Sequence, residues 1–83
     1  MKIIGEVFTI KRGNRKLTVV GVEITEDVIK VGDIVKIPLK NGEVVYKKII
    51  EFAVFGHMDY ALKGDKIGII IDYISPEKIE LKI

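Results

Sequence analysis

An all-β fold is what this sequence predicts, and three observations support the prediction. Isoleucine (16) and valine (10) supply 26 of the 83 residues, and branched side chains favour extended strands over helices. No stretch of ten or more residues repeats its apolar positions with the period of a helix. Turn-forming residues also recur at short, regular intervals, which is typical of small sandwiches and barrels.

The first two expected strands flank a charged tip. One strand covers residues 2–10, and the next covers residues 17–25. Alternate positions of a strand point to opposite faces, so one face of the first strand carries Ile4, Glu6, Phe8 and Ile10. The same alternation groups four residues of the second strand, namely Thr18, Val20, Val22 and Ile24. The polar residues 11–16 form the tip between the two strands.

The middle of the chain is expected to form a hairpin. A third strand covers residues 34–39 and ends near Pro38, where a missing backbone N–H is tolerated. Asn41 and Gly42 follow, and both residue types accept the positive φ angles of a tight hairpin turn. A long fourth strand then covers residues 43–55. We expect loops on either side of this hairpin, at residues 26–33 and 56–65.

The last part of the chain is expected to complete a barrel. A fifth strand covers residues 66–74 and is almost entirely apolar, which predicts burial on both faces, while Gly68 within it indicates a bulge or a close backbone approach. Ser75 is expected to cap one helical turn that opens with Pro76. Residues 79–83 form a sixth strand. Six strands without a long helix are expected to curl into one closed barrel, a single domain over residues 1–83 without an internal repeat.

Composition excludes several kinds of chemistry. The chain has no cysteine, which excludes disulfides, thiolate zinc sites and cysteine nucleophiles. A Ser–His–Asp arrangement would need both Ser75 and His57, the only serine and the only histidine. No P-loop pattern occurs. We therefore expect a binding module rather than an enzyme, with no catalytic residue, no cofactor and no metal.

Net charge and amino-acid composition indicate the kind of partner, the source and the cellular location to expect. Lys and Arg number 14 against 12 Asp and Glu, so the net charge of +2 is too small for a protein that coats DNA. The chain has 12 Lys and 7 Glu but no Gln or Trp, a choice typical of heat-adapted proteins, so we expect a thermophilic source. The apolar runs are too short to cross a bilayer and no signal peptide opens the chain. A cytoplasmic location without membrane contact is expected.

The order of five short motifs resembles a known family. In chain order the motifs are Val7-Phe8-Thr9-Ile10, Thr18-Val19-Val20, Val28-Ile29-Lys30-Val31-Gly32-Asp33, Gly64-Asp65-Lys66-Ile67-Gly68 and Pro76-Glu77-Lys78-Ile79-Glu80. Together they resemble, over nearly the whole chain, the second domain of translational GTPases, the β-barrel found in elongation factor Tu and its relatives. The third and fourth motifs are the specific ones. The resemblance implies a closed six-stranded barrel that binds a ligand, because the family's GTPase domain and third domain are not part of this sequence.

The resemblance also implies partners. In elongation factor Tu this barrel helps to hold the aminoacylated 3′ end of tRNA, and in other members of the family it touches ribosomal RNA. The partners expected for this chain are therefore tRNA, ribosomal RNA or a translation-related protein. Two differences lie near the implied pocket: Val54 stands where elongation factor Tu has an arginine, and the charged residues 11–16 replace the family's glycine-rich first turn.

Four residues form a candidate nucleotide pocket. By the resemblance, Phe8 falls at an aromatic position that lines the aminoacyl pocket, with Glu6 at an acidic position beside it. Glu51 falls where the family has a glutamate that contacts the terminal ribose, and Lys66 stands in place of an asparagine that binds the amino-acid end. An aromatic ring can stack on a base, and a carboxylate can accept a hydrogen bond from a ribose hydroxyl. The alternative is that Phe8 belongs to the core and Glu51 to the surface.

The charged tip is the candidate nucleic-acid-binding site. Its six residues include four cations, Lys11, Arg12, Arg15 and Lys16. Guanidinium groups bind phosphate through forked hydrogen bonds, and ammonium groups act as point charges. The alternative is a solvated hairpin tip whose charges only keep the protein soluble.

The remaining candidates are weaker. His57 and Asp59 supply too few ligands for a metal site, and Glu26 and Asp27 are expected to be ordinary loop residues. Three tyrosines, Tyr46, Tyr60 and Tyr73, would form a stacking platform if two of them lay on one face beside the tip.

Three functions remain open. The first is a non-enzymatic module that contacts RNA or a ribonucleoprotein through the tip. The second is a protein–protein adaptor or homo-oligomer building block without nucleic-acid binding, which an excess of exposed Ile or Val would favour. The third is a small enzyme.

Overall fold

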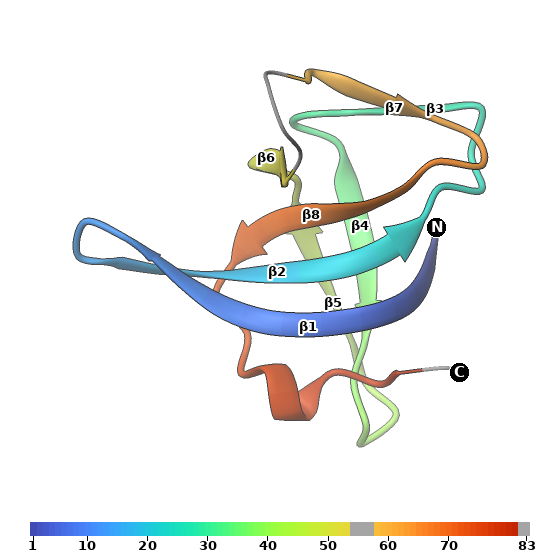
Figure 1. Cartoon of the computed structure of the whole chain (residues 1–83). Helices are drawn as coiled ribbons and strands as arrows, with labels where there is room; N and C mark the ends of the chain where they lie inside the picture. Colours follow the sequence, from blue (N-terminus) through green and yellow to red (C-terminus); the bar gives the residue numbers. More distant parts are fainter. Residues whose placement is uncertain (54–57, 82–83) are drawn as a thin grey trace.

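The computed structural model describes residues 1–53 and 58–81, and in these residues it confirms an all-β chain without an α-helix (Figure 1). In chain order the elements are β1 (Lys2–Arg12), β2 (Arg15–Glu23), β3 (Val28–Lys30), β4 (Ile34–Pro38), β5 (Val44–Lys48), β6 (Glu51–Ala53), β7 (Tyr60–Leu62), β8 (Lys66–Asp72) and the 3₁₀ turn η1 (Pro76–Lys78).

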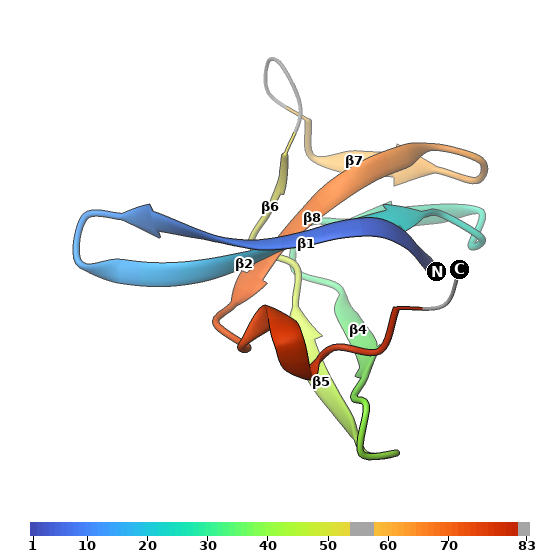
Figure 2. The same ribbon diagram turned by 60° about the horizontal axis from the view of Figure 1, so that its bottom comes forward.

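The described strands form three antiparallel sheets rather than one barrel. The largest sheet has the order β1-β2-β8-β6, while β3 pairs with β7 and β4 pairs with β5. The β4–β5 hairpin crosses behind the large sheet (Figures 1 and 2). The expected closed barrel was therefore wrong, although the all-β class was correct.

The large sheet and the β4–β5 pair do not join at β1 and β4. A hollow of about 280 Å³ is lined by Met1–Ile3 and by Lys36–Pro38. The edge of β4 is occupied instead by the segment after η1, because the N–H of Glu80 donates to the carbonyl of Pro38 at 2.9 Å and the N–H of Lys40 donates to the carbonyl of Lys78 at 2.9 Å. Pro38 itself has no N–H to offer to another strand. In the described residues β4 pairs only with β5, and β1 pairs only with β2.

The first hairpin is longer than its sequence suggested. The expected strands ended at residue 10 and began again at residue 17, but the pairing continues to Arg12 opposite Arg15. The turn is Gly13–Asn14, and Gly13 has a φ of 60°, as in a hairpin turn with glycine at its first central position. The hairpin projects from the body as an arm (Figure 1).

Two short strands lie in segments that were expected to be loops. Val28–Lys30 and Tyr60–Leu62 pair with each other as β3 and β7. Each ends in the same Gly–Asp turn. After β3 the carboxylate of Asp33 accepts a hydrogen bond from the N–H of Lys30 at 2.8 Å, and after β7 the carboxylate of Asp65 accepts one from the N–H of Leu62 at 2.8 Å.

Each Gly–Asp turn also holds one buried isoleucine through its backbone. Gly32 donates to the carbonyl of Ile49 at 2.8 Å, and the N–H of Ile49 donates to Asp33 at 2.9 Å. In the second turn Gly64 and Asp65 bind Ile24 in the same way, at 2.8 and 2.9 Å. The two glycines have φ angles of 96° and 93°, which favour glycine. The structure therefore contains a repeated turn that the sequence pattern did not reveal.

The expected long fourth strand is divided. The Asn41–Gly42 hairpin is present, with Gly42 alone at a positive φ of 90°. β5 ends at Lys48, and the chain then changes partners, because Ile49 bonds to Asp33 beside β4 while the N–H of Ile50 donates to Ile70 of β8 at 2.8 Å. β6 then continues on the large sheet. One strand thus becomes two because it passes from one sheet to another.

β8 is buried on both faces, as expected, at Ile69, Ile70 and Ile71. Ile69 and Ile71 lie in the main core, which fills the space between the three sheets, while Ile70 joins Leu17 and Val19 in a second cluster on the opposite face. The strand ends at Asp72 instead of Ile74. The buried hydroxyl of Thr18 satisfies the backbone of Ile74 beyond that end, donating to its carbonyl at 2.8 Å and accepting from its N–H at 2.9 Å.

The C-terminal segment differs from the prediction in two respects. Ser75 precedes the expected turn, but its hydroxyl donates to Glu77 at 3.0 Å and makes no cap to the backbone. Ile79 forms a single bridge with Leu39 rather than a strand, as far as residue 81. The last two residues of the expected strand, 82–83, lie outside the described part of the chain.

Candidate nucleic-acid interface

The projecting tip of the β1–β2 hairpin carries its four cations as two opposed pairs. Lys11 lies directly opposite Lys16, and Arg12 lies directly opposite Arg15. Neighbouring residues of a strand point to opposite faces, so the lysines occupy one face of the arm and the arginines the other. Like charges placed directly opposite each other destabilise a ladder. The tip therefore concentrates positive charge at an energetic cost to the hairpin.

The two arginines each meet a carboxylate from another strand. Arg12 forms an ion pair with Glu51 of β6, and Arg15 forms one with Asp72 of β8. The hydrogen bond to Glu51, together with its negative charge, raises the pKa of the Arg12 guanidinium above its ordinary value. All four side chains are about half exposed, and exposed ion pairs contribute little to stability because water competes for both partners. An incoming anion can therefore exchange with these carboxylates.

The lysine face of the tip lies beside an aromatic ring. The Nζ atom of Lys16 lies 5.3 Å from the centroid of the Tyr73 ring, within the range of a cation–π contact. Tyr73 is 43 % exposed. Tyr46 and Tyr60 lie elsewhere, on β5 and β7. The structure thus brings one of the three tyrosines to the tip, so the platform of two tyrosines beside it was not found.

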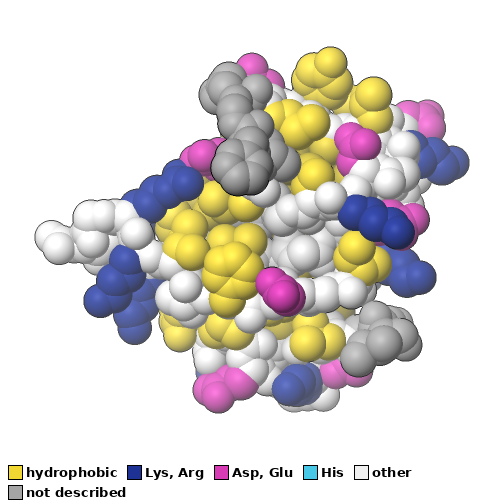
Figure 3. All heavy atoms as spheres, viewed as in Figure 1, with side chains coloured by type: hydrophobic (Ala, Val, Ile, Leu, Met, Phe, Trp, Pro, Cys, Tyr) yellow, Lys and Arg dark blue, Asp and Glu magenta, His cyan; other side chains and the backbone are white. Residues whose placement is uncertain are grey.

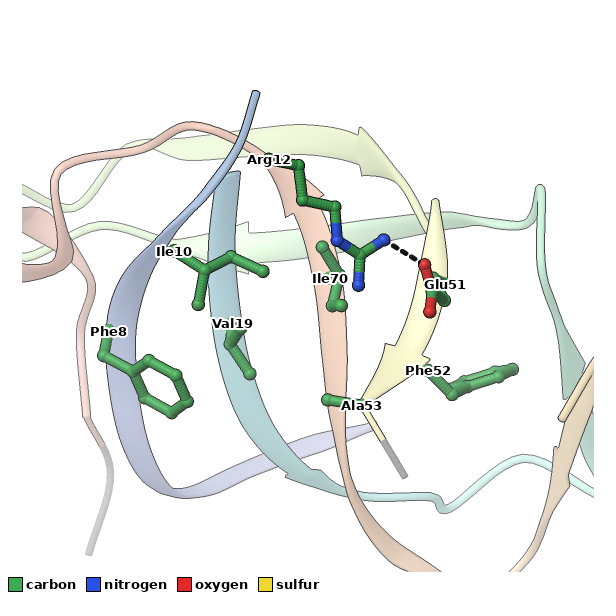
Figure 4. Close-up of a pocket in the computed structure, with 8 residues that line it drawn as sticks. All are labelled: Phe8, Ile10, Arg12, Val19, Glu51, Phe52, Ala53 and Ile70. Carbon is green, nitrogen blue, oxygen red and sulfur yellow. Dashed lines mark hydrogen bonds and ion pairs between the residues drawn. The ribbon is translucent and has the colours of Figure 1, made fainter. Parts of the chain in front are cut away.

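Below the tip, the outer face of the large sheet holds an apolar hollow. One cross-strand row runs from Phe8 through Val19 and Ile70 to Glu51. These residues, with Arg12 above them, line a hollow of about 390 Å³ (Figure 4). Figure 3 shows the apolar side chains gathered on this face, with basic side chains toward the projecting arm.

The placement of Phe8 decides between two interpretations of that residue. The ring is 45 % exposed and belongs to the outer face, whereas the core face of β1 carries Ile3 and Val7. The interpretation of Phe8 as a core residue was wrong. Its ring is accessible to a ligand, which is a condition for stacking on a base.

The other two pocket residues line a neighbouring hollow. Glu6 and Lys66 flank a space of about 410 Å³ that shares Ala53 with the first hollow. Gly68 forms part of its floor, and a Cβ atom there would lie 3.0 Å from Val19 Cγ1 and 3.1 Å from Ala53 Cβ. The atoms that crowd Gly68 belong to side chains, and its pairing with β2 and β6 has no register shift, so neither the expected bulge nor a close backbone approach was found. The four expected pocket residues lie in two adjoining hollows rather than in one.

Some residues of this surface were not found from the sequence. Ile10 lines the first hollow and Asp72 pairs with the tip. Asp72 lies 57 positions from its partner Arg15, and Glu51 lies 39 positions from Arg12. The pairing of β2 with β8 and of β8 with β6 brings each arginine close to its carboxylate. No local sequence motif predicts that pairing.

The weaker candidates do not form a site in the described residues. His57 lies outside them, and no cluster of three His, Cys, Asp or Glu side chains suited to a metal occurs within residues 1–53 and 58–81. Glu26 binds the N-terminal ammonium of Met1 at 2.9 Å. Partial burial raises the pKa of Glu26, but hydrogen bonds from that ammonium and from nearby backbone N–H groups outweigh it and leave the pKa below its ordinary value.

Comparisons with known proteins returned no match to a protein-family model, a curated protein or a solved structure. Among the described residues, no helix has the length and apolar character needed to span a membrane.

Proposed function

We propose that this chain is a non-enzymatic binding module that resembles the translation-factor barrel domains in its motif order and contacts RNA or a ribonucleoprotein through its arm. The contact residues are Lys11, Arg12, Arg15 and Lys16. The observation that carries the proposal is the pairing of two like charges, Lys11 opposite Lys16, at the end of a projecting hairpin whose two arginines are already paired with carboxylates. A phosphate backbone relieves that repulsion, and an uncharged partner does not.

The ion pairs of the two arginines are compatible with this role. A guanidinium has five N–H donors, so a single carboxylate leaves donors that can reach phosphate oxygens. On the opposite face, Lys11 and Lys16 supply point charges next to the exposed ring of Tyr73. Both faces of the arm can thus contact a nucleic acid backbone.

The hollows below the arm suit the end of an RNA strand. We propose that a terminal base stacks on Phe8 while Glu51 accepts a hydrogen bond from a ribose hydroxyl. Glu6 and Lys66 line the adjoining hollow. They would contact a chemical group attached to the end of that RNA strand. The motif order that resembles elongation factor domains supports this assignment.

The test is a salt titration of binding to bulk tRNA and to ribosomal RNA, followed by fluorescence anisotropy. Each phosphate contact to a single strand contributes about −0.7 to the slope of log affinity against log salt. With three to four such contacts we expect about a 30-fold loss of affinity between about 50 mM and about 200 mM salt. An affinity that does not fall as salt rises would contradict the proposal.

One observation favours the adaptor or homo-oligomer as a second candidate function. Val28 and Leu62 lie opposite each other on the β3–β7 pair and are 48 % and 49 % exposed, and Tyr60 beside them is 53 % exposed. Exposed apolar patches mark interfaces. Light scattering in high salt separates the two functions, because a stable dimer free of RNA would favour this second function.

A further inference from the structure

The outward face of the β4–β5 hairpin carries side chains that the core does not use. The pairing sets Ile34 opposite Lys48, Lys36 opposite Tyr46 and Pro38 opposite Val44, and strand alternation puts all of these side chains on one face. The other face of the hairpin enters the main core through Val35 and Ile37, which are 3 % and 1 % exposed.

Tyr46 is the most exposed aromatic side chain of the described residues, at 66 %. Lys36 lies directly across the ladder from it, and Lys48 lies two residues along the same strand, on the same face. Opposed residues of an antiparallel pair have Cβ atoms about 5 Å apart, and residues i and i+2 lie about 6.6 Å apart. One accessible ring thus has a cation on each of two sides.

The charges on this face favour one class of partner. Its six side chains, from Ile34, Lys36, Pro38, Val44, Tyr46 and Lys48, include two cations and no carboxylate. Glu26 lines a hollow beside four of them, but its carboxylate is paired with the N-terminal ammonium. An apolar protein surface would bury both ammonium groups without partners, which is costly. A single-stranded nucleic acid matches the aromatic ring and both cations, because bases stack on aromatic rings and phosphates pair with lysines.

We infer that this face is a second contact for RNA, in which an unpaired base stacks on Tyr46 while Lys36 and Lys48 bind the flanking phosphates. The inference rests on the proposed function for the class of ligand, but it concerns a different surface. The arm and the β4–β5 hairpin project from the body in different directions in both views (Figures 1 and 2). Two contacts on one molecule strengthen the binding of a strand long enough to reach both.

A tryptophan probe tests the stacking directly. The chain has no tryptophan, so Tyr46→Trp gives a single emitter on the proposed surface. We expect an oligouridylate of about 12 nucleotides to quench this emission saturably. Tyr60→Trp is the matched control, because Tyr60 is also exposed and also lies opposite a lysine, Lys30, in a two-stranded pair. Equal quenching of both variants, or none in Tyr46→Trp, would overturn the inference.

Affinity measurements with the labelled oligouridylate give an independent readout. Loss of one stacked base typically costs about 1–3 kcal/mol, so Tyr46→Ala is expected to bind roughly tenfold more weakly while Tyr60→Ala binds like the parent. The double variant Lys36→Ala with Lys48→Ala should lower the salt slope by about 1.4. If Tyr46→Ala binds with the affinity of the parent, the inference is overturned. A change in its oligomeric mass in that case would show that the face contacts protein instead.

The proposed RNA contacts at the tip and at the β4–β5 face are tested independently of each other. If the variant with four alanines at the tip binds RNA like the parent, the proposed function through the arm is wrong. Persistent quenching of Tyr46→Trp in that background would still support the contact at Tyr46. If oligouridylate does not quench Tyr46→Trp while the salt dependence of binding through the arm is unchanged, only the second contact is overturned.

Discussion

Replacing Ile49 or Ile24 by alanine is expected to lower the free energy of unfolding by about 3 kcal/mol in each case. Both side chains are almost completely buried, at 0 % and 1 % exposed. Each is held between the hydrogen bonds of a Gly–Asp turn, so the backbone cannot shift to refill the cavity. Truncations of buried isoleucine cost about 2–5 kcal/mol, with the largest values where the site cannot collapse.

Urea unfolding followed by circular dichroism measures this loss, with the m-value as a check that two-state behaviour is kept. Ile34→Ala is the matched control, since the same truncation at a side chain that is 60 % exposed should cost about 0.5 kcal/mol or less. The equivalence of the two turns predicts similar losses at Ile24 and Ile49. A loss near that of Ile34→Ala at either position would show that the turn does not hold its isoleucine firmly.

The sequence predicted those parts of the fold that depend on local signals. The alternation correctly grouped Thr18, Val20, Val22 and Ile24, which are all buried, but it did not show that Leu17 and Val19 on the opposite face are buried as well. The Asn41–Gly42 pair correctly located a hairpin. Burial on both faces, expected for the strand 66–74, was found at Ile69, Ile70 and Ile71, whereas Lys66, Asp72 and Tyr73 are exposed. In each case neighbouring residues carry the information, because a strand's two faces and a tight turn are properties of a few consecutive positions.

The short strands and the sheet closure depend on information that is not local. Val28–Lys30 and Tyr60–Leu62 are strands only because they pair with each other, and three residues are too few to show an alternating pattern. Closure of the barrel was expected from the number of strands, but the described strands pair in three separate sheets, and the segment after η1 bonds to the end of β4. Neither effect follows from the composition of a single segment.

The two motifs that seemed most specific in the sequence have a structural explanation. Lys30–Asp33 and Leu62–Asp65 form the same turn, in which the aspartate bonds back to the residue three positions earlier. In both turns the backbone also binds a buried isoleucine, so these residues have a role in the fold. The candidate site instead lies on the arm, where the cations were found from the sequence but their carboxylate partners, Glu51 and Asp72, were not.

Removing the four cations of the arm is expected to have the largest effect on function. The variant with alanine at Lys11, Arg12, Arg15 and Lys16 should lose about 3 from the magnitude of the salt slope and bind RNA about 100-fold more weakly at about 0.1 M salt. The loss follows from the phosphates that no longer release counterions on binding. Anisotropy titrations with bulk tRNA at several salt concentrations measure both quantities.

The matched control removes four exposed lysines from other parts of the surface, at Lys2, Lys40, Lys63 and Lys78. Both variants then carry the same formal net charge, so a general effect of charge weakens them equally, whereas a contact at the arm weakens only the first. Asp72→Asn adds a change in the opposite direction, because it releases the guanidinium of Arg15 for phosphate and should strengthen binding about threefold. Equal losses in the two four-alanine variants, with no gain from Asp72→Asn, would mean that the arm is a solvated tip and that its charges bind nothing.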